Sequence, residues 1–499
     1  MEYIVCLAAY LAIMMGVSIY SKSKTKNVND YTLGGRSIPS WMSAFSYGTA
    51  YFSAVILIGH AGKNGWSYGL GAFWIVLGNS ILGTYLAWKV LGPRTREMTQ
   101  RLGAATMPQF LAIRYKDQKL RSLSSLIIFI FLVPYAASVY KGLGYLFKIT
   151  FNMSENTIML IMTLITALYL FAGGFLAASI ADFIQGVIML VGVGLLIVFI
   201  LSSPEVNGIA NGVAGLREIN PDLIKPLTRD TALPLISLVI MTSLGTWGLP
   251  QMVSKFYTIK NNKSIPTAKI VSTIFAVVIT TGAYTMGTMS RLILNNDEST
   301  FTENGRLVYD KIVPMVINKT LPTIMIAVLL IVILAASMST LASIVMASST
   351  TFVMDLVKPL TGDRMTEKRT ITLLRICCIT FVAAAYFLAT GNSPILSLNS
   401  LSWGVVSGCM LAPYLLGLYW KNATKTGVYA SMVSAIVIMA AGVLKYSINS
   451  VMITTISACA MIIPIVVLAA VSLVTKLYEQ AHIDYIFSKT TSDVEADLE

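Results

Sequence analysis

Two apolar stretches of the chain, residues 40–61 and 233–256, are interrupted in the middle by residues that disrupt helices. The first contains Gly48 followed by polar side chains, and the second contains Gly245, Gly248 and Pro250. A helix that unwinds inside a bilayer exposes backbone groups, and each costs several kcal/mol unless something polar fills the gap. The two stretches lie five hydrophobic segments apart, so they would cross a membrane in opposite directions. Matching interruptions in two inverted halves are typical of the binding site of a secondary transporter.

The composition places this chain in a membrane. Apolar residues make up 56% of the 499 residues and charged residues 12%, whereas soluble domains carry about 25% charged residues. A hydrocarbon core of about 30 Å needs roughly twenty apolar residues per helix. The pattern therefore predicts an all-α membrane protein with about thirteen spans, at residues 3–20, 40–61, 71–92, 122–147, 157–176, 181–203, 233–256, 267–291, 321–355, 371–390, 393–419, 426–445 and 450–475. The segment that begins at 321 is too long for one simple crossing, so we expect a strong tilt or a short flanking helix.

The net charge of +13 is a topology signal and does not indicate nucleic-acid binding. Basic residues concentrate in alternate loops, most densely from Lys89 to Arg121, which predicts an N-outside, C-inside orientation. The first span, 3–20, has no basic residue before it and no convincing cleavage site, so we interpret it as a retained helix and not a signal peptide.

Several classes of protein are excluded by missing motifs. The five cysteines lie in apolar stretches without metal-ligand spacing and are expected to be small buried residues; they are Cys6, Cys377, Cys378, Cys409 and Cys459. Two histidines cannot build a metal site, no GxxxxGK[ST] phosphate loop occurs, and no nucleophile–base pair suggests an enzyme. We expect one transmembrane domain over residues 1–475, surface helices within 204–232 and 292–320, and a cytoplasmic tail at 476–499.

Four blocks of the sequence resemble the sodium:solute symporter family. They are LGGRSIPSWMSAFSYGTAYFSA (33–54), LYLFAGGFLAASIADFIQG (168–186), ILAASMSTLASIVMASS (333–349) and APYLLGLYWKNATKTG (412–427). The resemblance implies a LeuT-like fold with two inverted five-helix repeats, spans 2–6 at about 40–203 and spans 7–11 at about 233–419. Two short motifs, TAYFSA and WGLPQ, look most similar to the pantothenate carriers of the family.

The resemblance also implies a sodium site. A hard cation prefers oxygen ligands, and the family motif assigns them to the carbonyls of Thr49, Phe52 and Ala336 and the hydroxyls of Ser339 and Thr340. The alternative is structural, because hydroxyls in membrane helices often bond to the preceding turn or to neighbouring helices.

Asp182 is the second candidate for ion coupling, because an acid within a span is costly and by default functional. In some family members this aspartate binds a second sodium with hydroxyls of span 9. Ser339 and Ser343 remain on that helix here, but Ala342 occupies a position where those members carry serine. Ala342 argues against a complete second sodium site. Asp182 and Ser343 remain candidates for a second cation or for coupling, or else Asp182 holds the cytoplasmic end of span 6.

The solute is expected between the two broken spans, near the membrane midplane. Proline carriers have an aspartate where this chain has Tyr51, which argues against proline as the solute. The arginine that binds the carboxylate in sialic acid carriers aligns with Tyr135, so that chemistry is not copied directly either. An aromatic wall with a few polar groups suits a small polar organic molecule; the candidates are Tyr51, Ser53, Tyr135, Thr246, Trp247, Gln251 and Lys141. Trp247 fits helix packing equally well. Lys141, interpreted as the one cation within a span, fits snorkelling to the interface better than a role in the cavity.

These observations predict a multi-pass plasma-membrane protein, monomeric in lipid, that couples inward Na+ movement to uptake of a small polar solute by alternating access. No cofactor and no nucleic acid are expected. The solute could be an organic acid such as pantothenate or a monocarboxylate, or an amino acid. Proton coupling through Asp182, a sodium-independent facilitator and a transporter-like sensor remain alternatives.

Overall fold

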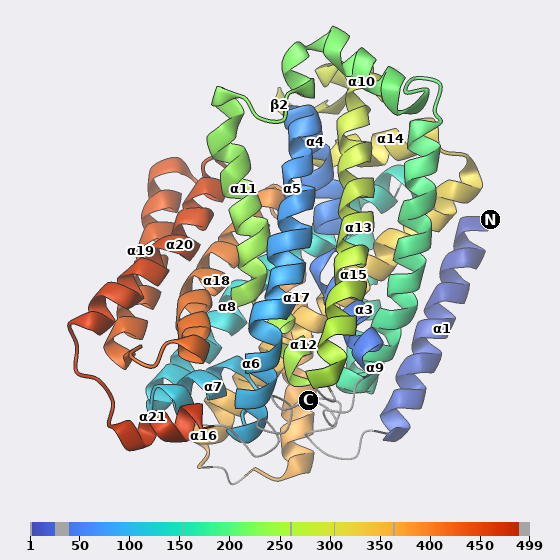
Figure 1. The fold of residues 1–499 in the computed structure, drawn as a ribbon. Helices are drawn as coiled ribbons and strands as arrows, with labels where there is room; N and C mark the ends of the chain where they lie inside the picture. The colour runs from blue at the N-terminus through green and yellow to red at the C-terminus, as the bar shows by residue number, and fades with distance from the viewer. Residues whose placement is uncertain are drawn as a thin grey trace.

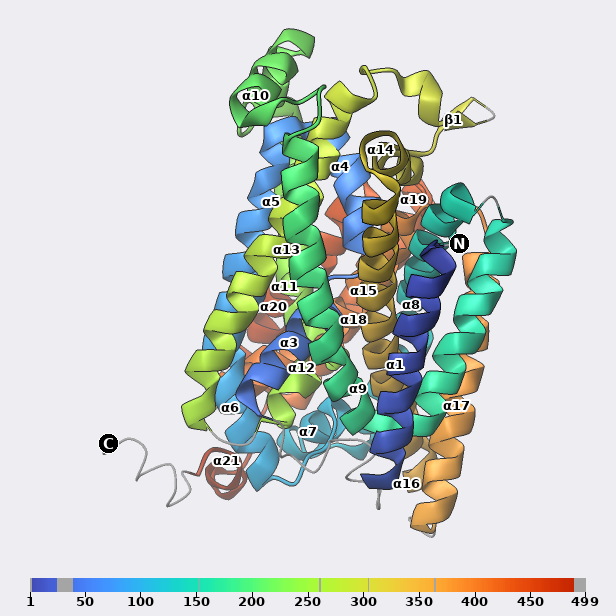
Figure 2. The ribbon, with the colours of Figure 1, turned by 90° about the vertical axis from the view of Figure 1, so that its right-hand side faces the viewer.

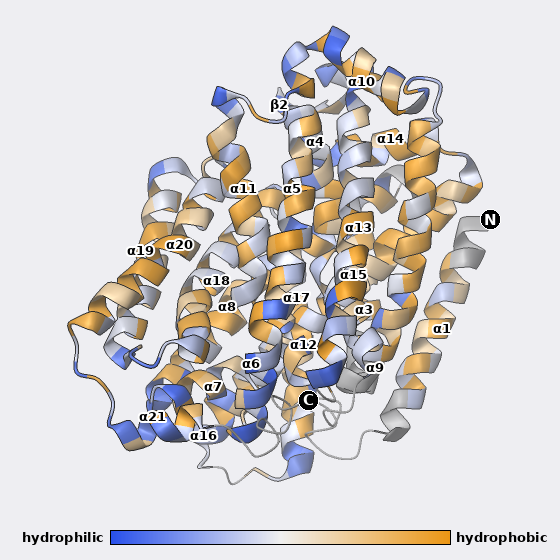
Figure 3. Cartoon of the chain, in the orientation of Figure 1, coloured by the Kyte–Doolittle hydropathy of each residue, from blue (hydrophilic) through white to orange (hydrophobic). Residues whose placement is uncertain are grey.

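The computed structural model describes residues 2–24, 39–151, 153–259, 262–303, 305–362 and 365–488. The helices stand side by side as one elongated bundle (Figure 1), and the apolar residues form a band around its middle, with polar residues at both ends (Figure 3). Within the described residues, ten helices are long and apolar enough to cross a membrane, and two shorter apolar helices cover Leu7–Tyr20 and Glu155–Thr166. The chain is therefore a multi-pass membrane protein, whereas the count of thirteen crossings and their orientation remain predictions.

The first half of the chain contains one preceding helix and the first predicted repeat. Its elements are α1 (Glu2–Lys24), α3 (Ser40–Tyr51), η2 (Val55–His60), α4 (Ala61–Tyr68), η3 (Gly69–Ala72), α5 (Phe73–Leu77), η4 (Gly78–Leu86), α6 (Ala87–Arg101), α7 (Met107–Arg114), α8 (Gln118–Phe151), α9 (Glu155–Leu201), α10 (Gly208–Ile219) and η5 (Pro221–Ile224). Elements η2 and η4 are π-helical.

The second half contains the second predicted repeat and the C-terminal helices. Its elements are α11 (Arg229–Gly248), α12 (Pro250–Tyr257), η6 (Asn262–Ser264), α13 (Ile265–Ile293), η7 (Glu298–Phe301), β1 (Thr302–Glu303), β2 (Arg306–Leu307), η8 (Tyr309–Lys311), α14 (Ile312–Thr320), α15 (Thr323–Thr351), η9 (Phe352–Val357), α16 (Lys358–Leu360), α17 (Glu367–Ala389), α18 (Ile395–Tyr419), α19 (Lys425–Tyr446), α20 (Ile453–Leu473) and α21 (Gln480–Phe487). β1 and β2 form a small antiparallel hairpin with Thr302 opposite Leu307.

Element α9 covers both predicted spans, 157–176 and 181–203. A straight helix of its 47 residues would be about 70 Å long, more than twice the hydrocarbon thickness. Figure 2 shows instead two legs, one descending beside α17 and one rising beside α13. The long segment from 321 is explained in the same way, because η9 and α16 extend α15 as the expected flanking helix. The expected surface helices are present as α10 and α14.

Burial separates central from peripheral helices. In α15 and α18, 83% of the most apolar window is buried inside the protein, compared with 33–39% in α17, α19 and α20. A helix that is apolar all round and enclosed by protein forms the core of a bundle, whereas one exposed on a side faces lipid. The two central helices therefore position the site. Cys459 on peripheral α20 is exposed, so the prediction that all the cysteines are buried is wrong for this residue.

Basic residues of α7 and the start of α8 connect helices at one end of the bundle. Arg114 of α7 is buried and donates to the carbonyls of Gly417 (3.0 Å) and Trp420 (2.9 Å), which satisfies the last carbonyls of α18. Burial lowers the pKa of this guanidinium from its ordinary value. Arg121 of α8 donates to Asp355 of η9 at 2.9 Å and thereby ties α8 to the extension of α15.

Candidate ion and solute site

The first predicted interruption is present between α3 and η2. The helical hydrogen bonds of α3 end where the Phe52 N–H donates to the Gly48 carbonyl at 3.0 Å, and Phe52 itself is extended (φ −106°, ψ 107°). Helical structure resumes where the N–H groups of Ile56 and Leu57 donate to the Ser53 carbonyl. A Cβ at Gly48 would lie 2.5 Å from the Phe275 ring, so glycine allows α3 to approach α13 closely.

The second predicted interruption lies at Leu249, between α11 and α12. Leu249 is extended (φ −83°, ψ 120°), and Pro250 starts the new helix, where its missing N–H costs nothing. A Cβ at Gly248 would lie 2.7 Å from the Cα of Ser407, so the backbone at the break packs directly against central helix α18. The Ser407 hydroxyl donates to the Gly245 carbonyl at 2.5 Å, an acceptor just before the break. Both interruptions predicted from the sequence are therefore confirmed.

Thr340 of α15 lies against the first break. Its hydroxyl oxygen is 3.0 Å from the Thr49 carbonyl, 3.4 Å from the Ala50 carbonyl and 3.0 Å from the Ala336 carbonyl. The structure thus brings together three of the five residues that the resemblance assigned to sodium: Thr49, Ala336 and Thr340. All three are buried. The Phe52 carbonyl lies at the same break, and its ring stacks on Tyr51 with centroids 4.2 Å apart.

Ser339 joins a second buried polar cluster, which we call the Asp182 cluster: Ser46, Asp182, Lys255, Ser339 and Ser343. The Ser339 hydroxyl donates to Asp182 Oδ1 at 2.6 Å, and the Ser46 hydroxyl donates to Asp182 Oδ2. The Lys255 ammonium lies 2.7 Å from the Ser46 hydroxyl, 3.1 Å from the Ser343 hydroxyl and 3.4 Å from Asp182 Oδ2. Asp182 and Ser343, which the sequence suggested as parts of one site, are thus connected through the ammonium group of Lys255.

The prediction that Lys141 is the one cation within a span is wrong. Lys255 falls inside 233–256 and only 2% of it is exposed. It was missed because it lies near the end of that stretch, where a basic residue is expected to reach the interface. The restart of the helix at Pro250 was a usable signal, since it places Lys255 within a new helix, α12, and not in a loop. Lys141 is itself 4% exposed, so it does not snorkel, and it interacts electrostatically with Glu155 and Asp310.

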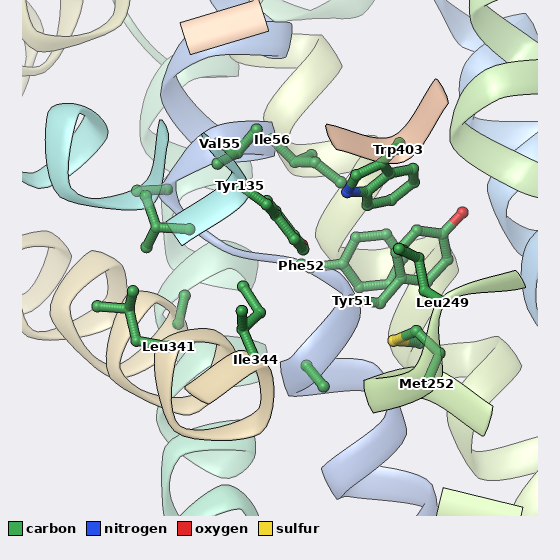
Figure 4. Packing of buried hydrophobic residues seen from close by; sticks show 14 of the residues in the cluster. Tyr51, Phe52, Val55, Ile56, Tyr135, Leu249, Met252, Leu341, Ile344 and Trp403 are labelled. Carbon is green, nitrogen blue, oxygen red and sulfur yellow. The ribbon is translucent and has the colours of Figure 1, made fainter. Parts of the chain in front are cut away.

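An aromatic layer lies between the two breaks (Figure 4). Tyr51, Phe52, Tyr135 and Trp403 are buried and close together. The Tyr135 and Trp403 rings meet edge to face at 5.5 Å, and the Tyr51 hydroxyl donates to the Thr242 carbonyl at 2.6 Å. Trp403, from α18, was not predicted, because an apolar helix far along the sequence gives no sign of which neighbour it faces. The Ser53 hydroxyl oxygen accepts from the Val55 N–H at 3.2 Å.

The remaining solute candidates differ in how their polar groups are used. Both amide atoms of Gln251 and the indole nitrogen of Trp403 are buried without a hydrogen-bond partner in the described part of the chain. By contrast, the Thr246 hydroxyl lies 3.2 Å from the Gly83 carbonyl and 2.8 Å from the Ser243 carbonyl, and the Trp247 indole donates to the Leu82 carbonyl at 2.9 Å. Thr246 and Trp247 therefore hold α11 against η4, and Gln251 and Trp403 are the groups with unused capacity.

A cavity opens toward the Asp182 cluster from the end of the bundle that contains α7. Its lining includes Thr106, Lys255, Tyr257, Ser343 and Thr350. No group of three or more histidine, cysteine or acidic side chains that could hold a metal ion occurs in the described ranges. Hydroxyls, carbonyls and one carboxylate are the available ligands, and these suit an alkali cation better than a transition metal.

The fold and these two interrupted helices define a transporter of the class with discontinuous transmembrane helices. The sequence model of the sodium:solute symporter family matches residues 31–435, and the chain belongs to this family. Its relatives are transporters and not enzymes, and Na+ is the coupling ion of the family, with no cofactor.

Two bacterial relatives are proline transporters by name. The high-affinity proline transporter PutP of Bacillus subtilis is 31% identical over 84% of this chain and 88% of the relative. The sodium/proline symporter of Staphylococcus aureus is 29% identical over 87% of this chain and 84% of the relative. The likeness of two short motifs to pantothenate carriers is not tested by these matches.

Solved structures support the same fold. A Na+-coupled sialic acid symporter in a substrate-bound outward-open state matches with a TM-score of 0.81 and 18% identity, covering 96% of this chain and 98% of that chain. A transporter of the nucleobase-cation-symport-1 family matches with a TM-score of 0.51 and 12% identity, over 91% and 97% of the two chains. The LeuT-like architecture implied by the sequence motifs agrees with these matches.

Proposed function

We propose that this protein couples inward Na+ movement to uptake of a small polar organic solute by alternating access across the plasma membrane. The observation that carries this proposal is the position of Thr340, whose hydroxyl lies 3.0 Å from carbonyls on two different helices, α3 and α15. One hydroxyl proton can satisfy only one carbonyl at a time. A cation would satisfy several of these oxygens together.

The proposed ion site needs one local change. The carbonyls of Thr49 and Ala336 already converge on Thr340, and the Phe52 carbonyl belongs to the same interrupted segment. Ser339 must turn from Asp182 Oδ1 toward the ion, and that breaks one hydrogen bond. An ion bound there would bridge α3 to α15, so its affinity would depend on the distance between these helices. This dependence is what couples an ion to a conformational change.

The proposed solute site uses the aromatic layer and the unused polar groups beside it. A small polar molecule that accepted from the Trp403 indole and paired with the Gln251 amide would remove two costs of burying unpaired groups. The names of the two bacterial relatives favour an amino acid such as proline, whereas Tyr51 at the position of the proline carriers' aspartate argues against proline itself. An organic acid such as pantothenate or a monocarboxylate fits the same groups. Tyr51 contributes its ring more than its hydroxyl, which is already bonded to Thr242.

The ion gradient is sufficient for active uptake. One charge moving down 100 mV supplies about 2.3 kcal/mol, and a tenfold concentration gradient adds roughly 1.4 kcal/mol. Together these energies support a ratio of inside to outside solute concentration on the order of several hundred for each ion carried.

Thermal stabilisation of the purified protein across a solute library, with and without Na+, tests the proposal. Ligands that bind the folded state raise its apparent stability according to their occupancy. We expect a solute whose stabilisation increases with Na+ and not with K+. A solute that stabilises equally in both salts would overturn the coupling and leave a facilitator or a sensor.

A further inference from the structure

The Asp182 cluster has the composition of a cation site, but a side chain fills it. Ser46 of α3, Asp182 of α9 and Ser343 of α15 direct oxygens at one point, and the Lys255 ammonium of α12 occupies that point. We propose that Lys255 is a tethered resident cation of the Asp182 cluster, which takes the place of a second Na+ and limits the carrier to one Na+ per cycle. This inference rests on the proposed sodium coupling and adds its stoichiometry.

The geometry fits an ammonium group closely. An ammonium has three N–H donors, and three oxygens surround Nζ of Lys255 at 2.7, 3.1 and 3.4 Å. Three helices besides its own supply these oxygens, so the position is specified by the packing of the bundle. Only 2% of Lys255 is exposed and none of Asp182. A buried charge without an opposite partner is strongly unfavourable, so each of these two residues requires the other.

A second cation in the same cluster would meet like charge. Asp182 Oδ2 and the hydroxyls of Ser46 and Ser343 are already used by the ammonium, and Ala342 adds no further oxygen to the helix at that level. An incoming Na+ beside Lys255 would be repelled by the ammonium in a low-dielectric interior, and a Na+ that displaced Lys255 would break its buried ion pair with Asp182. Removing the ammonium while keeping the carboxylate leaves a negatively charged set of oxygens, which is the composition that a hard cation prefers.

One carboxylate links this cluster to the proposed sodium site. Asp182 Oδ1 accepts from Ser339, the neighbour of Thr340, while Oδ2 faces Lys255. When Ser339 turns to the ion, Asp182 loses one hydrogen-bond donor. Ser46 and Lys255 then remain to stabilise the carboxylate charge. The cavity that reaches Lys255 and Ser343 provides a route by which a small cation could enter once the ammonium is gone.

The test is the number of Na+ ions bound per chain, measured with radioactive ²²Na+ on the purified full-length protein, together with the Hill coefficient for Na+ stabilisation. The wild type is expected to bind one ion. Lys255→Met keeps most of the side-chain volume, removes the charge and is expected to bind two ions with a Hill coefficient above one. Lys255→Arg keeps the charge and is expected to bind one ion. Lys269→Met, on a lysine that lies 4.7 Å from the centre of the Tyr85 ring, is the matched control.

The double variant Asp182→Asn with Lys255→Met removes both charges, so it leaves no buried unpaired charge and should return to one ion. Two ions in the wild type would overturn the proposal by itself, whether or not any variant folds. A single ion in a folded Lys255→Met protein would overturn it as well. No sodium binding in the wild type would instead contradict the proposed sodium coupling, and the two failures are therefore distinguishable.

Discussion

The hydroxyl of Thr340 lies 3.0 Å from the carbonyl oxygen of Thr49, although the two residues are separated by 291 positions in the chain. This contact joins central helix α15 to the end of α3, where the backbone leaves the helix. A carbonyl freed by a break inside a membrane needs a partner, and here the partner comes from a helix that also carries two further candidate hydroxyls. The relationship is the structural basis of the proposed ion coupling.

Loss of the Thr340 hydroxyl should weaken Na+ binding. A hydroxyl ligand contributes about 1–2 kcal/mol, so Thr340→Ala is expected to raise the Na+ concentration for half-maximal stabilisation by about tenfold. Thr280→Ala is the matched control, because Thr280 is buried and its hydroxyl bonds to the preceding turn at the Ala276 carbonyl. An unchanged Na+ response in Thr340→Ala would remove this residue from the site.

Gly248 should be intolerant of a side chain. A Cβ there would lie 2.7 Å from the Cα of Ser407, and backbone atoms cannot move aside cheaply. Gly248→Ala is therefore expected to destabilise the protein by about 2 kcal/mol and to lower uptake. Gly194→Ala, in helix α9, meets no atom within 4 Å and is expected to be neutral or slightly stabilising. Thermal midpoints of the two variants in the same detergent make the comparison, and equal midpoints would show that the α11–α18 contact is not tight.

Gln251 should contribute to solute affinity and not to folding. Its amide atoms have no hydrogen-bond partner in the described structure, so Gln251→Leu removes a desolvation cost and is expected to keep or raise the thermal midpoint. The apparent affinity for the solute, measured from the stabilisation it produces, should fall by about tenfold. In contrast, Gln185 donates to the Tyr10 hydroxyl at 2.8 Å, so Gln185→Leu should lower the midpoint and leave solute affinity unchanged. The opposite pattern would place the solute elsewhere.

Asp310, in the short helix η8 before α14, should make stability depend on pH. Burial raises the pKa of its carboxyl above the usual value, and the charges of Lys63 and Lys141 oppose that rise. The folded state therefore binds the proton more tightly than the unfolded chain. The contribution of Asp310 to stability is complete below the unfolded pKa and is lost as pH rises through the folded pKa.

The measurement is the thermal midpoint of Asp310→Asn relative to the wild type, from about pH 4 to neutral pH. Asparagine keeps an oxygen for the N–H of Ile395, which Asp310 accepts at 3.2 Å. The advantage of the variant should grow as the pH rises. Asp222→Asn, at an exposed position, is the control. A difference that shrinks with rising pH would mean that the two lysines outweigh burial.

The sequence was most informative where a local rule applied. Gly248 ends α11 and Pro250 begins α12, so the second interruption lies at the residues that indicated it. The first interruption lies within the predicted stretch, but it begins at Phe52, whereas Gly48 is inside helix α3. The position of Thr340 relative to Ala336 follows from the helical repeat alone. Its contact with Thr49 came from the resemblance to the family and not from any property of the two residues.

The contacts that the sequence did not reveal are those between helices. Lys255 and Asp182 are 73 positions apart, and Trp403 and Tyr51 come from opposite ends of the chain. Nothing in hydrophobic periodicity tells which two apolar helices meet or which polar residues face each other. Lys255 lies near the end of an apolar stretch and was therefore not recognised as a cation within a span, whereas the packing of three other helices buries it beside a carboxylate.

The most direct test of sodium coupling is accumulation of the identified solute in proteoliposomes under an imposed inward Na+ gradient. We predict uptake above the equilibrium level for the wild type, and loss of sodium-stimulated uptake in the double variant Ser339→Ala with Thr340→Ala, which should still insert. Replacement of Na+ by K+ should abolish the accumulation. Uptake that never exceeds equilibrium, or normal uptake by the double variant at low Na+, would contradict the proposed mechanism.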